Sequence, residues 1–192
     1  MDLMQVTAPL LGFLTDATVF DSGSSVATAG WKGGIVEFEV AAYLGSDLGP
    51  GASDDEARNA VSAIGPAIEL ANITQPPGPE VVPEVLAADI FHEGVIFGHR
   101  DEERAGLDVT GLEARIFVDG AERAVVTDAQ AITGPYPWIV ATVANTLAAF
   151  GQRLRAGDVI ITGSVIPPIP VTEGTEFTMN LGQYAPISVI AD

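Results

Sequence analysis

The chain has 192 residues, of which 47% are apolar, and a mean hydropathy of +0.32. A chain of this length can bury one substantial core, so we expect a single domain over residues 1–192. Its 26 acidic and 8 basic residues give a net charge of -18, which disfavours binding to nucleic acids or anionic membranes. The absence of cysteine excludes disulfides, thiolate catalysis and cysteine-based zinc sites.

The N-terminal sequence has neither a basic region nor a long apolar stretch, and no segment reaches the roughly 20 apolar residues of a membrane span. We therefore expect a soluble, cytoplasmic protein with no membrane partner. A P-loop, a dinucleotide-binding fingerprint and a Gly-x-Ser-x-Gly elbow are also absent from the sequence, which removes the commonest competing classes of enzyme.

Residues 34–44 alternate in a way that predicts a β-strand. One side of this strand is wholly apolar, whereas the other carries Glu37 and Glu39. The following segment, residues 48–66, predicts a short helix that begins after Ser53, with Glu56 at capping-box distance, and ends at the Gly65-Pro66 pair.

Residues 67–73 predict a second strand. Residues 74–85 contain four prolines, so we expect an exposed, mobile loop there, because proline cannot pair in the interior of a sheet. Residues 112–127 predict a hairpin, since Asp119 and Gly120 favour the positive φ angles of a tight turn.

Residues 137–150 predict the longest helix, because its apolar residues recur at helical spacing. These residues are Ile139, Val140, Val143, Leu147 and Phe150, and we expect Ile139, Val143, Leu147 and Phe150 to pack against the sheet. Residues 158–164, 176–182 and 185–191 predict short strands. The overall pattern indicates an α+β fold that is mainly β, with a few helices.

Two carboxylates at positions i and i+2 of a strand project from the same face, with backbones roughly 6 to 7 Å apart. Glu37 and Glu39 are spaced in this way, and Glu69 lies in the neighbouring predicted strand. Three carboxylates that converge from two strands suit Mg²⁺ better than zinc or copper. The alternative is that Glu37 and Glu39 form the solvated face of a half-buried strand and that Glu69 points outward from an edge.

Several blocks of the sequence resemble, in order and spacing, the 2-keto-4-pentenoate hydratase and 2-oxo-3-hexenedioate (4-oxalocrotonate) decarboxylase family, which belongs to the fumarylacetoacetate hydrolase superfamily. These blocks are PLLGFLTD (9–16), VEFEVAAYLGSDL (36–48), GPAIELANI (65–73), ANTLAAFGQRLRAGDVIITGS (144–164) and EFTMNLGQYAPISV (176–189). The GFLTD string is closer to the decarboxylase branch.

The resemblance implies a mixed β-roll or sandwich with a few flanking helices, usually in homo-oligomers. It also implies that Glu37, Glu39 and Glu69 hold Mg²⁺ or Mn²⁺, which binds a 2-oxo acid or its dienol and stabilises the enolate formed during hydration or decarboxylation.

The sequence departs from the family around these glutamates. The family has a lysine in a K-[IV]-G-L-T-S segment that precedes the region matched here, and Lys32, the one lysine in this sequence, is not equivalent to it. Leu10 and Leu11 follow Pro9 where hydratases have an acidic residue. Ile35 replaces a basic residue, and residues 71–73 replace Asp-Ser-Arg.

His92, in an expected loop, is the candidate substitute for the missing acid-base groups, and Asp89 lies where the family has an aspartate. Their alternatives are a structural histidine and a turn-capping aspartate. His99 lies in a charged run and is expected to face solvent. Gly163 and Ser164 could present an N–H and a hydroxyl to a substrate carboxylate, or could form a tight strand exit.

Two hypotheses follow. The first is a metal-dependent lyase, a hydratase or decarboxylase whose reaction could have drifted to dehydration or cyclisation, that acts on a small 2-oxo acid or an enolisable dicarbonyl compound. The second is a catalytically degenerate family member that serves as a partner subunit in a complex with a homologous enzyme. The absence of the lysine favours the second hypothesis, and the three glutamates favour the first.

Overall fold

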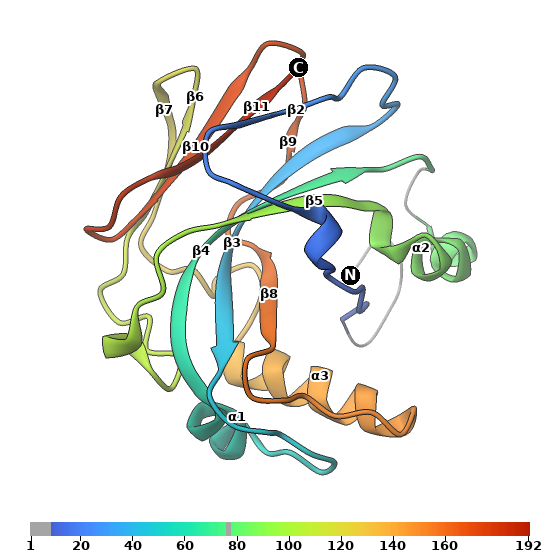
Figure 1. The fold of residues 1–192 in the computed structure, drawn as a ribbon, viewed down its shortest axis with the longest axis vertical. Helices are drawn as coiled ribbons and strands as arrows, with labels where there is room; N and C mark the ends of the chain where they lie inside the picture. Colours follow the sequence, from blue (N-terminus) through green and yellow to red (C-terminus); the bar gives the residue numbers. More distant parts are fainter. Residues whose placement is uncertain (1–8, 76–77) are drawn as a thin grey trace.

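A computed structural model describes residues 9–75 and 78–192. Two β-sheets form the body of the molecule (Figure 1). The first sheet has the order β1 (Val19–Phe20), β5 (His92–Phe97), β4 (Val61–Asn72), β3 (Gly34–Leu44) and β8 (Val159–Ser164), with β9 (Ile169–Pro170) also paired with β3. The second has the order β2 (Ser24–Val26), β11 (Ile187–Ala191), β10 (Glu176–Leu181), β6 (Ala114–Val118) and β7 (Ala121–Val126).

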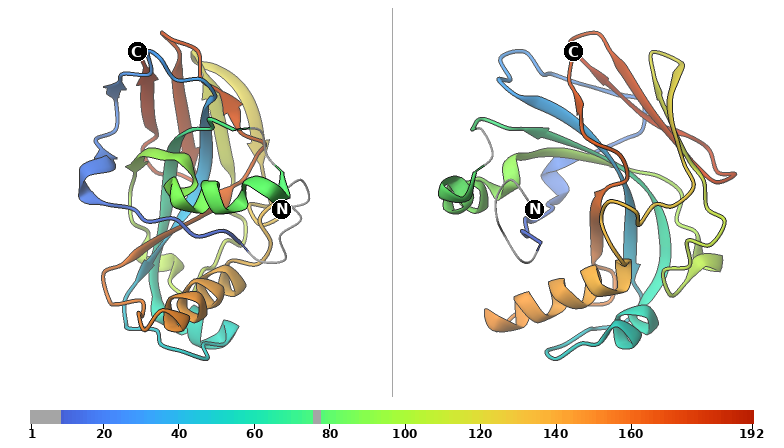
Figure 2. Two further views of the ribbon diagram at one scale, coloured as in Figure 1. Left: turned by 90° about the vertical axis from the view of Figure 1, so that its right-hand side faces the viewer. Right: turned by 180° about the vertical axis from the view of Figure 1, so that it is seen from behind.

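In the described part of the chain, three α-helices accompany the sheets: α1 (Asp54–Ala60), α2 (Val82–Ala87) and α3 (Tyr136–Ala149). Figure 2 shows the second sheet on one side of β3 and β4, whereas α2 and the N-terminal segment lie on the other side. Short 3₁₀ turns lie at Asp16–Thr18, Pro79–Val81, Asp89–Phe91 and Glu102–Arg104. Among the described residues, no helix has both the length and the apolar character needed to cross a bilayer.

The alternation of β3 separates the main core from the face that carries the glutamates, as predicted; further along that second face, Ala41 and Tyr43 belong to a smaller buried apolar cluster. Val36, Phe38 and Val40 are fully buried and belong to the same cluster as Phe177 and Val189 of the second sheet. Because these apolar side chains all leave one face of β3, the intervening glutamates leave the other face. The hydrophobic core therefore fixes which way the two glutamates point.

The strand that carries Glu69 is longer than predicted. The helix after Ser53 has the expected capping box but ends at Ala60, and β4 then runs from Val61 through the Gly65-Pro66 pair that was expected to end the helix. The reason is pairing: β4 lies antiparallel to β3 along its whole length, and the carbonyl oxygen of Pro66 accepts a hydrogen bond from Gly98. Proline supplies no N–H, but it still supplies this acceptor.

The prediction of a loop over residues 74–85 is wrong in part. A 3₁₀ turn occupies Pro79–Val81 and α2 begins at Val82; residues 76–77 lie outside the described residues. Pro83 stands in the first turn of α2, where a helix has no use for the missing N–H. The proline signal here marks a helix start as well as a loop.

The longest described helix, α3, and the hairpin are confirmed. In the hairpin, Asp119 and Gly120 have φ angles of 50° and 74°. Of the predicted apolar positions of α3, Ile139 and Val140 are buried, and Val143 and Leu147 are partly buried against the core, whereas Phe150 is 79% exposed. Ala144, which the predicted pattern did not include, is buried as well. The strands predicted near residues 158–164, 176–182 and 185–191 are present as β8, β10 and β11.

Candidate metal centre

Three glutamates meet on the polar face of β3 and β4. Glu37 and Glu69 are directly opposite each other in the antiparallel register, and Glu39 lies two residues further along β3. One carboxylate oxygen from each residue lies within 4.8 Å of the others. The strand alternation that predicted the pair thus also brings the third carboxylate to the same place.

Glu39 occupies the innermost position and is 2% exposed. The N–H of Gly163 on β8 donates a hydrogen bond of 2.6 Å to its Oε2 atom. The pairing of β3 with β8 is irregular between Glu39 and Ala41, and Gly163 has a φ of 93°, a conformation that glycine adopts without strain. This irregularity turns the N–H of Gly163 toward the carboxylate.

Burial disfavours the ionisation of all three carboxyl groups, and the neighbouring charges add to this effect for Glu39 and Glu69. Burial raises the pKa of Glu37. Burial raises the pKa of Glu39 well above its ordinary range, and the nearby Glu69 and Glu37 charges raise it further. Burial, followed by the Glu37 charge, raises the pKa of Glu69 to about 8. Without a cation, the site therefore retains protons that isolated carboxyl groups would lose near neutral pH.

The donor set fits a hard divalent cation. Within residues 9–75 and 78–192, no lysine or arginine forms an ion pair with any of the three carboxyl groups. Three oxygen donors from two strands leave further coordination positions for water or a bidentate ligand, the arrangement that Mg²⁺ prefers. A bound cation would also relieve the mutual repulsion. Glu37, Glu39 and Glu69 are hence the residues that would hold it.

His92 lies beside the triad and not in a loop, because it is the first residue of β5. Its Nδ1 atom is 2.7 Å from Oε1 of Glu69, and its Nε2 atom is 3.1 Å from the hydroxyl oxygen of Thr18. The His92 side chain is only 4% exposed, and burial lowers its pKa. In contrast, His99 is exposed, as expected, and its ring stacks on that of Tyr184.

Asp89 begins an unusual turn that leads into His92. Asp89, Ile90 and Phe91 all have positive φ angles, between 52° and 64°, a conformation that costs non-glycine residues energy. An oxygen of Asp89 accepts a 2.6 Å hydrogen bond from the N–H of Phe13. The carboxylate of Asp89 is near enough to raise the pKa of both Glu69 and His92. It therefore combines a structural contact with proximity to the site.

Gly163 and Ser164 already have partners in the protein. The N–H of Gly163 binds Glu39, while the Ser164 hydroxyl oxygen accepts a hydrogen bond of 3.1 Å from the N–H of Phe38. Both groups therefore support β3 in this structure, and the strand-exit alternative describes them better. A contact of either group with substrate stays a prediction.

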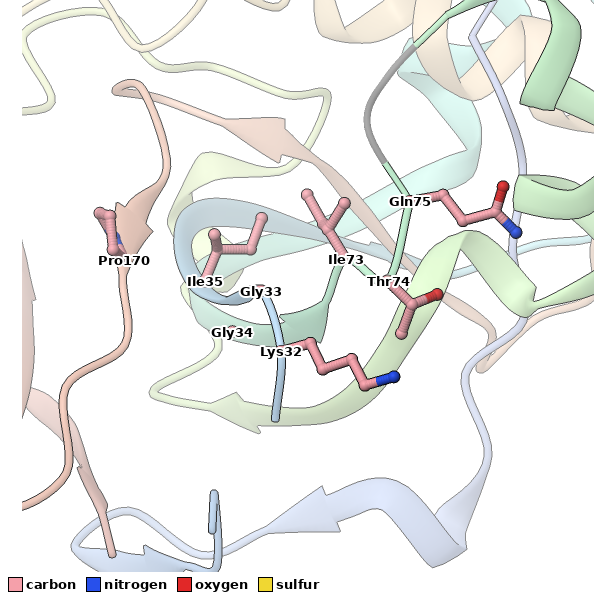
Figure 3. A pocket seen from close by; sticks show the side chains of 8 residues that line it. All are labelled: Lys32, Gly33, Gly34, Ile35, Ile73, Thr74, Gln75 and Pro170. Atoms are coloured by element: carbon pink, nitrogen blue, oxygen red, sulfur yellow. The ribbon is translucent and has the colours of Figure 1, made fainter. Parts of the chain in front are cut away.

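A hollow of about 440 Å³ opens at the beginning of β3 (Figure 3). Ile35, which shares a strand face with Glu37 through the two-residue period, lines it. Figure 3 shows Lys32, Thr74 and Gln75 toward one end and Pro170 at the other. The hollow thus combines aliphatic surface with the side chain of one lysine, and its lining reaches along β3 as far as Ile35, two residues before Glu37.

Sequence reasoning missed Thr18, which touches His92 from the 3₁₀ turn Asp16–Thr18. It also missed the short strands β1, β2, β5 and β9. These strands have two to six residues, too few for a clear periodic signal. A lone threonine 74 positions from the histidine that it contacts leaves no local signature.

Comparisons with known proteins place this geometry in a family. The family described as fumarylacetoacetate (FAA) hydrolase C-terminal matches residues 2–187. The 2-hydroxyhexa-2,4-dienoate hydratase of Comamonas testosteroni is 29% identical over 181 residues, which cover 93% of this chain and 68% of that relative. The 2-oxo-hept-4-ene-1,7-dioate hydratase of Escherichia coli is 28% identical over 191 residues, covering 96% of this chain and 71% of the relative.

Among solved structures, 4-oxalocrotonate decarboxylase from Pseudomonas putida G7, complexed with magnesium and adipate, superposes with a TM-score of 0.88 at 23% identity. The match covers the whole of this chain and 73% of that one. The expected α+β fold and the resemblance to hydratases and decarboxylases are both confirmed by these matches. The chain belongs to the fumarylacetoacetate hydrolase family.

Proposed function

We propose that this protein is a divalent-metal-dependent lyase, a hydratase or decarboxylase, that acts on a small 2-oxo acid. The observation that carries the proposal is the convergence of Glu37, Glu39 and Glu69 within 4.8 Å. Relatives named as hydratases and the similar fold of a magnesium-bound decarboxylase support it. When bound, Mg²⁺ or Mn²⁺ supplies a Lewis acid that favours negative charge on substrate oxygens.

The protein's own residues would shape the site around the substrate. The core-facing side chains of β3 hold Glu37 and Glu39 on a rigid strand, and Gly163 fixes the orientation of Glu39. In our proposal, the far end of the substrate enters the hollow beside Ile35, where the ammonium group of Lys32 attracts a second carboxylate. The acid-base role predicted for His92 and Asp89 stays a prediction.

The function is tested by incubating the Mg²⁺-loaded protein with 2-hydroxyhexa-2,4-dienoate and with 4-oxalocrotonate while the ultraviolet absorbance of the conjugated system is followed. We expect turnover of at least one of these compounds, which EDTA and Glu39→Gln abolish. Glu113→Gln, which changes a half-exposed carboxylate outside the site, serves as the matched control and should leave turnover unchanged. Turnover that survives both EDTA and Glu39→Gln would contradict the proposal.

Oxalate, an enolate mimic, separates the enzyme from the partner-subunit hypothesis. A Mn²⁺-loaded enolising enzyme should bind oxalate, and a crystal of the complex should show it next to the three glutamates. A protein that binds neither oxalate nor any of the test substrates, and that instead co-purifies with a homologous enzyme, would be a partner subunit.

A further inference from the structure

His92 makes two hydrogen bonds that together fix its ring. Nδ1 meets Glu69 at 2.7 Å, and Nε2 meets Thr18 at 3.1 Å. Both ring nitrogens are therefore engaged by protein side chains, and the ring itself is 4% exposed. A histidine held at both ends has little freedom to move toward a substrate.

The direction of the hydrogen bonds follows from the threonine. The Thr18 hydroxyl has one proton and donates it to the carbonyl oxygen of Thr15, 3.1 Å away. Its oxygen is then left to accept from His92, so Nε2 carries a proton in this network. Nδ1 of the neutral ring is consequently the acceptor, and in the metal-free protein the carboxyl group of Glu69 donates its proton to Nδ1. The hydrogen-bonded chain runs from Glu69 through His92 and Thr18 to the backbone at Thr15.

We propose that His92 is a positioning residue that fixes the carboxyl plane of Glu69 toward Glu37 and Glu39. The inference rests on the proposed metal site and deepens it. Glu69 gains a partner on a neighbouring strand, and the ring of His92 is itself anchored to the 3₁₀ turn Asp16–Thr18. A group that hydrogen-bonds to a metal ligand and fixes its orientation raises the affinity of the site for the metal ion, because the ligand then loses less conformational freedom when the ion binds.

This role differs measurably from acid-base catalysis. A proton-transfer residue must reach the substrate, and its loss lowers turnover while metal affinity is retained. A residue that fixes Glu69 changes the affinity of the protein for the metal ion even when no substrate is present. The two nitrogens can also be mimicked separately, because the amide group of asparagine, which can donate or accept, lies at the position of Nδ1, whereas that of glutamine lies at the position of Nε2.

The test is calorimetric titration of the full chain with Mn²⁺, for the wild type and for His92→Ala, His92→Asn and His92→Gln. We expect His92→Ala to weaken Mn²⁺ binding by about 10- to 100-fold. His92→Asn should recover most of that loss because it still reaches Glu69, and His92→Gln should recover less. His99→Ala, at the exposed histidine, is the matched control and should bind Mn²⁺ as the wild type does.

A His92→Ala variant that binds Mn²⁺ within about twofold of the wild type would overturn the positioning role. Far-ultraviolet circular dichroism shows whether that variant folds. If it does not, the comparison of His92→Asn with His92→Gln decides, and equal affinities overturn the proposal. Failure of the wild type itself to bind Mn²⁺ would instead contradict the metal site, so the two failures are distinguishable.

Discussion

At the scale of single residues, the site combines charges that destabilise one another. Glu39 is the clearest case, since it is buried, its pKa is raised well above the ordinary range, and its one hydrogen-bond donor among the described residues is the N–H of Gly163. A fold gains nothing from such a carboxyl group unless something binds there. The arrangement is therefore better explained by ligand binding than by stability.

Glu39→Gln should stabilise the metal-free protein at pH 8. Glutamine has nearly the same shape and still offers an oxygen to Gly163. It also removes the cost of burying or protonating, on folding, a carboxyl group that is ionised in the unfolded chain. We expect the free energy of unfolding to rise by at least about 1 kcal/mol. Urea titration in EDTA measures this change. A loss of stability would show that the Glu39 charge is compensated within the protein.

Lys32 offers a test of substrate choice at the residue scale. Its ammonium group borders the hollow next to the triad, so Lys32→Met should weaken binding of a dicarboxylate more than that of a monocarboxylate. With the Mn²⁺-loaded protein, we expect adipate affinity to fall by about 10-fold and acetate affinity to stay within about twofold. Equal effects on both ligands would exclude a contact between Lys32 and a second carboxylate.

At the scale of elements, a strand or helix could be predicted from the sequence where its alternation of apolar and polar residues extends over many positions. The eleven residues of β3 alternate clearly, so the face with Glu37 and Glu39 could be predicted. The extension of β4 back to Val61 could not, because it depends on pairing with β3 over its whole length. The contact between His92 and Thr18 joins segments 74 residues apart and arises from the topology of the sheet alone.

The α3 helix shows how a correct element can have a partly wrong face. Its sequence is apolar on several sides, so periodicity alone placed both Val140 and Phe150 in the buried pattern, although Val140 is buried and Phe150 is exposed. The contacts of α3 with α1 and β8 determine which side of the helix is buried. Phe150 lies just after the last helical residue, in the turn that ends the helix. Burial could therefore be assigned only from the packed structure.

Two substitutions in this region test the assignment. Val140→Ala, at a fully buried position, should lower the free energy of unfolding by about 1.5 to 3 kcal/mol. Phe150→Ala, at a residue that is 79% exposed, should change it by less than about 0.5 kcal/mol. Urea titrations of both variants measure the difference, and the reverse order of effects would mean that the helix packs through its other stripe.

At the scale of the whole molecule, the triad makes stability depend on pH and metal. Each of the three carboxyl groups has a raised pKa in the folded protein, with that of Glu69 at about 8. The folded state thus binds more protons than the unfolded chain above the ordinary glutamate pKa, and its stability falls as the pH rises. The homo-oligomeric state implied by the family resemblance is a separate property and stays a prediction.

The metal-free protein should lose stability between about pH 4.5 and pH 8, by at most about 1.4 kcal/mol per pH unit for each carboxyl group. Added Mg²⁺ should recover the loss at pH 8 and have little effect at pH 5, where protons compete for the same oxygens. Thermal unfolding in EDTA and in Mg²⁺ across this range measures both effects. A metal-free stability that rises from pH 5 to pH 8 would contradict the assigned pKa shifts.

The most direct test of the proposed metal centre is a calorimetric titration of the protein with Mn²⁺ at pH 8. The wild type should bind one ion per chain, and Glu37→Gln, Glu39→Gln and Glu69→Gln should each weaken binding by at least about 10-fold, while Glu113→Gln should leave it unchanged. Wild-type Mn²⁺ affinity in the double variant Glu37→Gln, Glu39→Gln would show that the ion binds elsewhere and that the three converging glutamates are not a metal centre.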